Sequence, residues 1–459
     1  MIYEMKNILR SRFSIICFVI LFMVNIIGSL NVLGNIEHQS NQDMYTTVAT
    51  NILQKKNLLK ANTNTYQNQI TGLNKEEKKY WENYLEYNKW EIHAYERIRD
   101  CYKEDKVNDD EFNELNFLLT LTDMSIYTDE NYQDYGYDMV FKNDKTYIDN
   151  LIKKHNIGFD LSVLGKLNDG IDANEKHAYY TDRLKRAEDS LYRLKSGEKQ
   201  LFLGSNSPWS YLINQLDDES LFSFIVLPLG LIFSIVSMMQ SIRNRSMNLI
   251  AVQPFSRFKI AMKKIISIYL SYMLITILSL FIPMVIVGIK YGWGGFHSTI
   301  LADLTGYRSL SSYEFDPTLK AGFGLSKYYG IPNDLFLIKG AFISERLQFV
   351  PMILVLGLSL IMLSLLLYVY VLIGAGIILF VKKHIIQYLL IGSVTIIYFL
   401  SHFYSFLHFK WNIFGYPSCM RMAVGGMQAS QLMVFVCIII FIISLLFCFW
   451  KFQNKEVEL

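Results

Sequence analysis

Six long apolar stretches constrain the fold of this chain more than any other feature of its sequence. They cover roughly residues 13–33, 220–240, 265–289, 349–380, 385–407 and 430–450. None of them contains Asp, Glu, Lys or Arg. Each reaches the length of about 20 apolar residues that a helix needs to cross the hydrocarbon core of a bilayer. The sequence therefore predicts an all-α polytopic membrane protein with six transmembrane helices.

The positive charge between these stretches predicts their orientation. With the N-terminus in the cytoplasm, thirteen Lys and Arg against three acidic residues fall in the cytoplasmic segments 1–12, 241–264, 381–384 and 451–459. Basic residues close to a membrane are retained on its cytoplasmic side. Segment 35–218 then lies outside, with 23 basic and 32 acidic residues and thus a net charge of −9. We expect a multi-pass protein of the plasma membrane with both termini cytoplasmic and residues 35–218 extracellular.

The first apolar stretch must be distinguished from a signal peptide, which also begins with basic residues and an apolar run. Its apolar part is longer than a usual signal core, and no small-x-small cleavage site follows it cleanly. We therefore expect an uncleaved first helix, whereas cleavage would leave five spans. Frequent Asn, Ile, Lys and Tyr residues are typical of an AT-rich genome and favour a bacterial source.

The apolar stretches divide the chain into three parts. The predicted parts are an amphipathic helix with the first span at 1–34, an extracellular domain at 35–218, and a transmembrane domain of five helices at 219–459. The third part contains a cytoplasmic loop at 241–264 and extracellular loops at 290–346 and 408–429, and the last of these is apolar enough to dip back into the membrane. The fourth stretch is too long for one straight span, so Gly374 and Gly376 predict a tilt or a break near its end.

The extracellular domain is predicted to be mainly helical. Residues 75–102 show a broad apolar face without Pro or Gly, and 178–194 interleave opposite charges at helical spacing. Asn108 to Asp110 resemble a cap before a helix at 111–121, whereas 127–147 fit turns or short strands as well as a helix. The aromatic residues fit the core of a small helical domain better than a carbohydrate- or peptide-binding surface. Whether Cys101 and Cys419 pair is left open by the sequence.

The sequence lacks the motifs of several enzyme classes. No Walker A, HExxH, CxxC or GxSxG pattern is present, and the short cytoplasmic segments leave no room for a nucleotide-binding domain. An enzymatic function would rest on His402 and His408, at the outer end of the fifth stretch, or on outer carboxylates. The spans also lack the charged residues that couple transport to ions. We therefore expect no catalytic, cofactor or metal site in this chain, and an energy source in another protein.

The cytoplasmic segment 240–267 is the most specific part of the sequence. It contains Met247, Leu249, Ile250 and Val252, followed by Pro254, Phe255, Ser256 and Arg257. This spacing predicts a short amphipathic helix near the membrane that ends at the proline and is followed by a second helix. An ordinary basic loop bound to anionic lipid would show a similar pattern. Basic residues that would anchor the chain at the membrane surface are Arg10, Arg12, Lys263, Lys264, Lys382 and Lys383.

The order of these residues resembles the permease subunit of type-2 ATP-binding-cassette exporters, the ABC-2 family. In that family a cytoplasmic element between spans two and three reads as an acidic residue, Gly-Thr, Leu-Leu, Pro-x-Ser-Arg and then Lys. Here Leu249-Ile250, Pro254-Phe255-Ser256-Arg257 and Lys263 stand in the same order, whereas Arg243 to Ser246 replace the acidic residue and Gly-Thr. Residues 3–12 also resemble the amphipathic N-terminal helix of the family, and the six predicted spans fit its topology.

The resemblance implies a permease that pairs with a second permease subunit, identical or different, and docks on two ABC ATPase subunits that hold ATP and Mg. Residues 247–252 would then sit in a cleft of the ATPase and transmit its closure. The implied cargo is a peptide, a lipid-like molecule or an antibiotic moved outward. Membrane lipids are expected as partners and nucleic acid is not. The alternative is a sensor or resistance component whose extracellular domain, with its net charge of −9, binds a cationic antimicrobial peptide.

Overall fold

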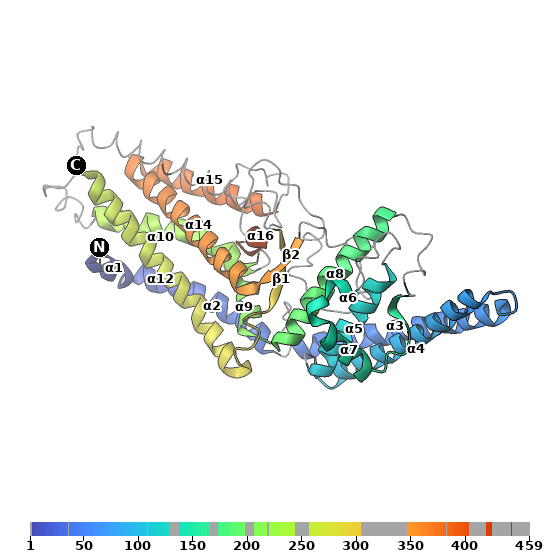
Figure 1. Cartoon of the computed structure of the whole chain (residues 1–459). Coiled ribbons are helices and arrows are strands. Elements are labelled where there is room, and N and C mark those ends of the chain that lie inside the picture. Colours follow the sequence, from blue (N-terminus) through green and yellow to red (C-terminus); the bar gives the residue numbers. More distant parts are fainter. Residues whose placement is uncertain are drawn as a thin grey trace.

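The chain folds mainly into helices, which form two bodies placed end to end with a small sheet between them (Figure 1). One body, the bundle, contains the N-terminal helices and the second half of the chain. The other, the polar domain, is built from residues 36–197. The computed structural model describes residues 2–34, 36–107, 109–127, 137–162, 164, 173–197, 206–217, 220–243, 257–303, 347–381, 383–403, 419–424 and 442.

The bundle contains the candidate membrane spans. Its helices are α1 (Ile2–Leu9), α2 (Arg12–Leu33), α9 (Pro208–Leu216), α10 (Leu221–Arg243), α12 (Arg257–Tyr291), α14 (Met352–Phe380), α15 (His384–Phe403) and α16 (Cys419–Val424). Helices α2, α10, α12 and α14 are long and apolar enough to cross a membrane, so four of the predicted spans coincide with helices that are candidate membrane spans. The fifth predicted span coincides with α15, whose apolar part, Ile385–Ser401, is shorter. The sixth, 430–450, lies outside the described residues except for residue 442.

The polar domain is also helical. Its elements are α3 (Ile36–Gln69), α4 (Lys75–Lys103), α5 (Asp110–Ile126), α6 (Tyr137–Val140), the short 3-10 helix η2 (Lys142–Asp144), α7 (Lys145–Lys154) and α8 (Ala173–Ser196). Helices α3 and α4 form a long hairpin that projects away from the bundle (Figure 1). A capping box starts α4: the Asn74 side chain accepts from the backbone N–H of Glu77 at 2.9 Å, and the Glu77 carboxylate accepts from the N–H of Asn74 at 2.8 Å.

The helices that the sequence predicts in this domain are confirmed and are longer than predicted. Residues 75–102 lie in α4, 178–194 lie in α8 and 111–121 lie in α5. Helix α5 begins at Asp110 after the capping residue Asp109, whose side chain makes no capping hydrogen bond. The described part of 127–147 forms helices rather than strands.

Several aromatic residues of α4 belong to a core, as predicted. Tyr87, Trp90 and Tyr95 are buried. Phe159 packs edge-on against Tyr87 and Trp90, with ring centroids 5.5 and 5.7 Å apart. This arrangement is one that aromatic pairs prefer, because the positive edge of one ring meets the negative face of the other. Helix α5, which is buried over most of its length, completes the core.

Two short strands depart from the predicted all-α class. Strand β1 (Thr299–Asp303) pairs antiparallel with β2 (Leu347–Pro351), so that Thr299 lies opposite Pro351 and Asp303 lies opposite Leu347. The fourth predicted span therefore begins at Met352 rather than at residue 349. The physical reason is Pro351, which has no N–H to continue the strand and fits the start of a helix.

Helix α14 runs unbroken through its glycines, so of the two predicted alternatives the break near Gly374 is wrong and the tilt stays a prediction. A Cβ atom at Gly374 would lie 2.8 Å from the carbonyl oxygen of Leu231 on α10. Nearby, the Ser234 hydroxyl donates to the carbonyl oxygen of Val371 at 2.7 Å. The glycine therefore permits the close approach of α10 and α14, as small residues do between membrane helices.

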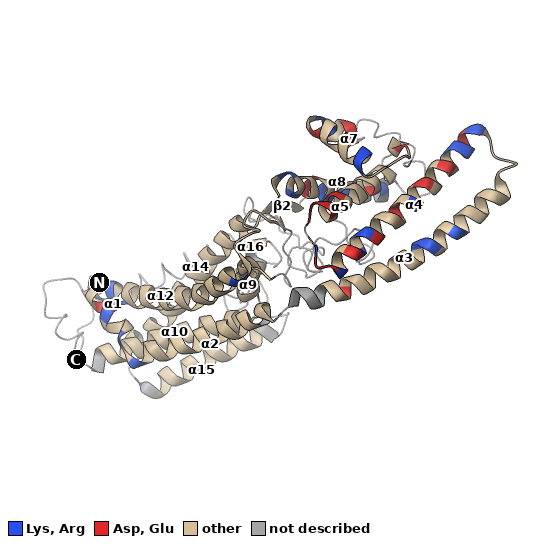
Figure 2. Ribbon diagram, turned by 90° about the horizontal axis from the view of Figure 1, so that it is seen from below, with Lys and Arg blue, Asp and Glu red and all other residues tan. Residues whose placement is uncertain are grey.

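Charged residues are distributed unevenly over the two bodies. Figure 2 shows Lys, Arg, Asp and Glu mainly on the polar domain and at the end of the bundle that carries α1, while the length of the bundle is almost free of them. Among the described residues, Cys17, Cys101 and Cys419 are buried free thiols. Cys101 and Cys419 are therefore not paired with each other.

Candidate functional site

The segment that the sequence singles out connects two neighbouring candidate spans. Helix α10 ends at Arg243 and α12 begins at Arg257, and both of these helix ends lie at the bundle end that carries α1 (Figure 1). Most of the predicted coupling residues lie outside the described residues: Met247, Leu249, Ile250, Val252, Pro254, Phe255 and Ser256. Of Arg257, the first residue of α12, only the backbone is described. The structure thus fixes where this segment starts and ends.

Helix α1 packs against α12 and matches the predicted amphipathic N-terminal helix. Ile8 is buried, whereas Ile2 and Tyr3 are exposed. The Ser267 hydroxyl of α12 donates to the Glu4 carboxylate at 3.3 Å, and the Ser14 hydroxyl of α2 donates to the carbonyl oxygen of Ile8 at 2.5 Å. A short helix that is tied to the bundle and still exposes apolar side chains suits the surface of a membrane.

The predicted basic anchors gather at the same end of the bundle. Arg10, Arg12, Lys263 and Lys383 are exposed, and Lys264 is half-buried. Lys382 lies outside the described residues. Arg10 and Arg12 join α1 to α2, the two lysines Lys263 and Lys264 lie in the second turn of α12, and Lys383 precedes α15. Exposed cations at this level suit contact with anionic lipid headgroups.

The interior of the bundle is polar in places but uncharged. The hydroxyl of Tyr211 on α9 donates to the side-chain oxygen of Asn25 and to the carbonyl oxygen of Leu280, both at 3.3 Å. The amide of Asn25 donates in turn to the Ser279 hydroxyl at 3.4 Å. Ion- or proton-coupled transport needs a titratable group in such a position. The described parts of the predicted spans contain no Asp, Glu, Lys or Arg.

Helix α9 is an element of the bundle that the sequence did not reveal. Its residues Tyr211, Leu212 and Leu216 are buried within the apolar core of the bundle. A signal for this helix is present in the chain, because Ser207 caps it by accepting from the N–H of Trp209 at 3.2 Å and Pro208 occupies its first position. Helix α16, in the predicted outer loop 408–429, is likewise buried in the bundle at Cys419, Met420, Ala423 and Val424, as a segment dipping back would be.

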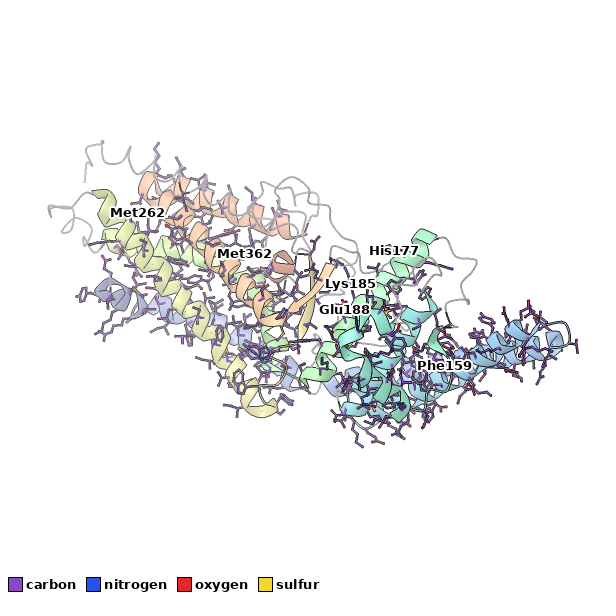
Figure 3. All side chains as sticks on the ribbon, viewed as in Figure 1. Phe159, His177, Lys185, Glu188, Met262 and Met362 are labelled. Carbon is purple, nitrogen blue, oxygen red and sulfur yellow. The ribbon has the colours of Figure 1, made fainter. Side chains whose placement is uncertain are left out.

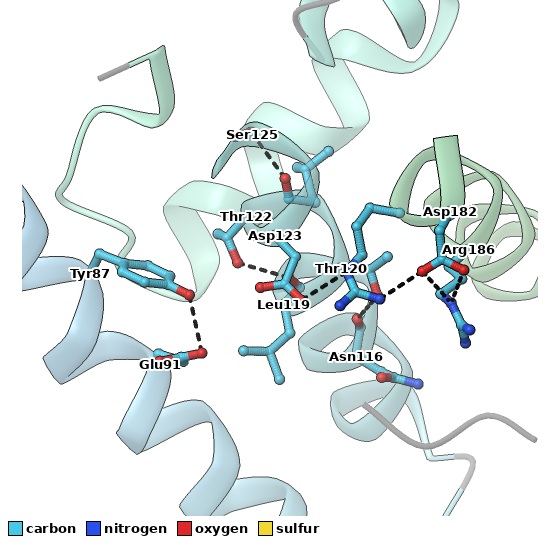
Figure 4. Close-up of polar contacts among 12 residues, drawn as sticks. Tyr87, Glu91, Asn116, Leu119, Thr120, Thr122, Asp123, Ser125, Asp182 and Arg186 are labelled. Carbon is cyan, nitrogen blue, oxygen red and sulfur yellow. Dashed lines mark hydrogen bonds and ion pairs between the residues drawn. The ribbon is translucent and has the colours of Figure 1, made fainter. Parts of the chain in front are cut away.

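Buried ion pairs hold the polar domain together. The Arg183 guanidinium on α8 lies 2.7 Å from the Asp182 carboxylate and 3.5 Å from that of Asp123 on α5, with only 1% of the Arg183 side chain exposed. Arg186 also pairs with Asp182, at 3.1 Å. Figure 4 shows the pair of Asp182 with Arg186 on α8 and labels Asp123 on α5. Removing one partner of such a group leaves an uncompensated buried charge, which costs about 3–5 kcal/mol.

A second group of polar residues links α5 to the end of α7. Glu114 accepts from Lys154 and contacts His155, each at 2.7 Å. Burial alone raises the pKa of Glu114, but the hydrogen bonds from Lys154 and His155 outweigh it and hold the pKa below its ordinary value. Glu114 is therefore an internal ion-pair partner and not a free acceptor for a ligand.

The two histidines on which an enzymatic function would rest are not brought into a described site. His408 lies outside the described residues, and only the backbone of His402 is described. The enzymatic alternative therefore stays a hypothesis.

Comparison with known proteins gives one match. The family model described as "ABC-2 family transporter protein" matches residues 1–307 of the 459 in this chain. The matched region runs from α1 through the polar domain to β1, and it includes segment 244–256. Neither the comparison with curated proteins nor that with solved structures found a match.

Proposed function

The chain belongs to the ABC-2 family of transporter proteins and is a component of membrane transport, and from this premise we propose that it is the permease subunit of an ATP-driven exporter. Its cargo would be amphipathic: a peptide, a lipid-like molecule or an antibiotic. Outward direction follows from the resemblance to exporters. The uncharged interior of the described spans supports an amphipathic cargo over an ion, because an ion would need charged or coordinating groups along its path.

We further propose the complete topology: six spans, both termini in the cytoplasm, and residues 35–218 outside. The observation that supports it is the placement of the exposed basic residues. Arg10, Arg12, Lys263 and Lys383 all lie at the bundle end opposite to the polar domain. Basic residues are retained on the cytoplasmic side, so this end faces the cytoplasm and the polar domain faces outward.

The energy comes from partner ATPase subunits that bind ATP and Mg, and a second permease subunit completes the transporter. Segment 244–256 docks on the ATPase through Met247, Leu249, Ile250 and Val252. Burying apolar surface provides roughly 25 cal/mol per Å², so three or four such side chains supply several kcal/mol. Because this segment connects α10 to α12, a movement of the segment acts directly on two of the candidate spans.

Co-purification in native lipid tests this proposal. The chain should bring down a near-equimolar protein that contains Walker motifs, and the complex should hydrolyse ATP. Leu249→Asp combined with Ile250→Asp should remove the partner or uncouple its ATP turnover, because charge replaces the apolar contact. The matched control is Ser246→Asp with Asn248→Asp, which adds the same charge at polar positions of the same segment. An unchanged complex in the Leu249/Ile250 variant would refute the docking role, and equal loss in both variants would assign the effect to charge alone.

The second candidate function is a sensor or resistance component that binds a cationic antimicrobial peptide. It is favoured by the net charge of −9 in residues 35–218. Several carboxylates there are already paired, including Glu91 with Lys55 at 2.6 Å and Glu111 with Arg97 at 2.7 Å. The field of the whole domain, rather than a set of free carboxylates, would then attract the peptide. ATP turnover that moves a labelled cargo into inside-out vesicles would favour the exporter, and peptide binding without such movement would favour the sensor.

A further inference from the structure

The polar domain is joined to the bundle first at the boundary of α2 and α3. Only Gly34 and Asn35 separate these two helices. The end of α12 holds this boundary, because Lys290 Nζ and the Tyr291 hydroxyl both donate to the carbonyl oxygen of Leu33, at 3.1 and 3.2 Å. The polar domain is therefore joined here to the end of α2, which α12 holds.

A second contact joins the polar domain to the sheet. Lys185 Nζ on α8 donates to the carbonyl oxygen of Leu347 in β2 at 2.7 Å, and the Thr299 hydroxyl in β1 donates to the Asp189 carboxylate on α8. Figure 3 shows Lys185 on the side of α8 toward β2. Leu347 and Thr299 lie at opposite ends of the two-stranded ladder. Helix α8 thus holds the sheet at two points, which resists rotation as well as separation.

Helix α8 is itself fixed in the polar domain. Asp189 is buried and pairs with Arg193 at 3.0 Å on the next turn. Arg183, with its partners Asp182 and Asp123, attaches the same helix to α5. A displacement of the sheet is therefore passed to the whole polar domain, because a packed core with buried ion pairs does not deform continuously.

The sheet continues directly into the bundle. Strand β2 ends at Pro351 and α14 begins at Met352, whose N–H donates to the carbonyl oxygen of Ser298 at 2.7 Å. Helix α14 packs on α10 around Gly374, and α10 leads to segment 244–256. The two contacts of the polar domain therefore reach different sets of candidate spans: the first reaches α2, whose end is held by α12, and the second reaches α12 through β1 and α14 through β2.

We propose that the contact of α8 with β1 and β2 couples the conformation of the polar domain to the arrangement of the spans. When α14 moves relative to α2, a rigid polar domain that is joined to α2 and bound to the sheet must turn or strain its contact with the sheet. Because such coupling is reciprocal, a ligand that binds the polar domain more tightly in one arrangement of the spans shifts the spans toward that arrangement. The inference rests on the proposed function, because the ATPase drives the movement of the spans.

Hydrogen exchange of the complex with its co-purified ATPase tests this coupling, with and without ATP and vanadate. In the native chain, trapping should change exchange in peptides of both α14 and α8, by a factor within the roughly 5- to 150-fold range typical of allosteric coupling. The variant combines Lys185→Met with Thr299→Val, which removes both donors and keeps similar side-chain shapes. It should retain the response in α14 and lose the response in α8. The control combines Lys195→Met, which removes a pair with Asp144 on the same helix, with Thr46→Val on the exposed side of α3, and should behave like the native chain.

Two results would overturn the coupling while leaving the proposed function intact. One is a response of α8 in the double variant equal to that of the native chain. The other is a native α8 that does not respond while α14 does. A different result, in which no ATPase co-purifies or no peptide of the bundle responds to nucleotide, would overturn the proposed function and this inference with it.

Discussion

Arg183 is the residue whose removal should cost the polar domain the most stability. Its guanidinium lies 2.7 Å from the carboxylate of Asp182, which has no exposed side-chain surface, and 3.5 Å from that of Asp123, which is 10% exposed. Arg183→Met keeps the aliphatic stem but leaves two buried carboxylates at the interface of α5 and α8. Removing one partner of a buried ion pair costs about 3–5 kcal/mol, most of it the penalty of the charge left behind.

Native-state hydrogen exchange of the full chain in lipid nanodiscs measures this loss locally. Peptides from α5 report on the polar domain, and peptides from α14 provide an internal reference, since unfolding of a two-body protein need not be a single transition. At 1.4 kcal/mol for each factor of ten, the expected loss corresponds to roughly a hundred- to several-thousand-fold faster exchange in α5. Exchange in α14 should stay within experimental error.

Two controls separate the buried charge from the loss of any ion pair. Lys195→Met removes a 2.6 Å pair with Asp144 in which the lysine side chain is half exposed, and such pairs contribute about 0–1 kcal/mol. Arg183→Met combined with Asp123→Asn should recover part of the loss, because one of the two carboxylates that lose Arg183 is then neutral, while Asp182 keeps its pair with Arg186. The reasoning is refuted if Arg183→Met accelerates exchange in α5 no more than Lys195→Met does.

Three further predictions follow from the packing and the titrating groups. Gly374→Leu should separate α14 from α10 and lower the melting temperature of the detergent-solubilised chain, because overpacking typically costs about 1–3 kcal/mol; Gly357→Leu, on the same helix with no atom within 4 Å of a Cβ, should not. Because its hydrogen bonds hold the pKa of Glu114 below the ordinary value despite burial, the stabilisation from Glu114 should be complete above about pH 4.3 and be lost as the pH falls through the folded pKa. Glu114→Gln should flatten that part of the acid dependence in urea titrations followed by circular dichroism, and an unchanged slope would contradict the assignment. Burial raises the pKa of the Cys101 thiol to about 11, so a maleimide at pH 8 should label Cys101 only after denaturation, and a disulfide found there by mass spectrometry would contradict the fold.

Much of the bundle could be predicted because the length of a membrane span is a local property of the sequence. Charge-free runs of about 20 residues are enough to place α2, α10, α12 and α14, whatever they pack against. Helix α4 could be predicted for a similar reason, since its cap at Asn74 and Glu77 and its apolar face lie within one segment.

The sheet and its contact with α8 could not be predicted, because they depend on pairing between distant residues. Strands β1 and β2 have five residues each, and the chain between them is far longer than a hairpin turn. Nothing local in 347–351 distinguishes the end of an apolar span from a short buried strand. Only part of the candidate site is described by the structure. The ends of α10 and α12 are placed, whereas the roles of Leu249 and Ile250 stay predictions.

The contacts inside the bundle differ from those inside the polar domain in how easily one partner can be replaced by another. In the bundle, neutral hydroxyls donate to backbone carbonyls of neighbouring helices, as Tyr272 does to Val226 at 2.7 Å and Tyr398 does to Ser223 at 3.1 Å. Such bonds between membrane helices contribute only about 0.6–2 kcal/mol each, and a shifted helix presents new carbonyls to the same donor. In the polar domain, Arg183 cannot leave Asp182 and Asp123 without exposing buried charge. A rearrangement that starts at segment 244–256 must therefore be accommodated by the bundle, while the polar domain moves as one piece. The contact of α8 with β1 and β2 joins the bundle, which rearranges, to the polar domain, which moves as one piece.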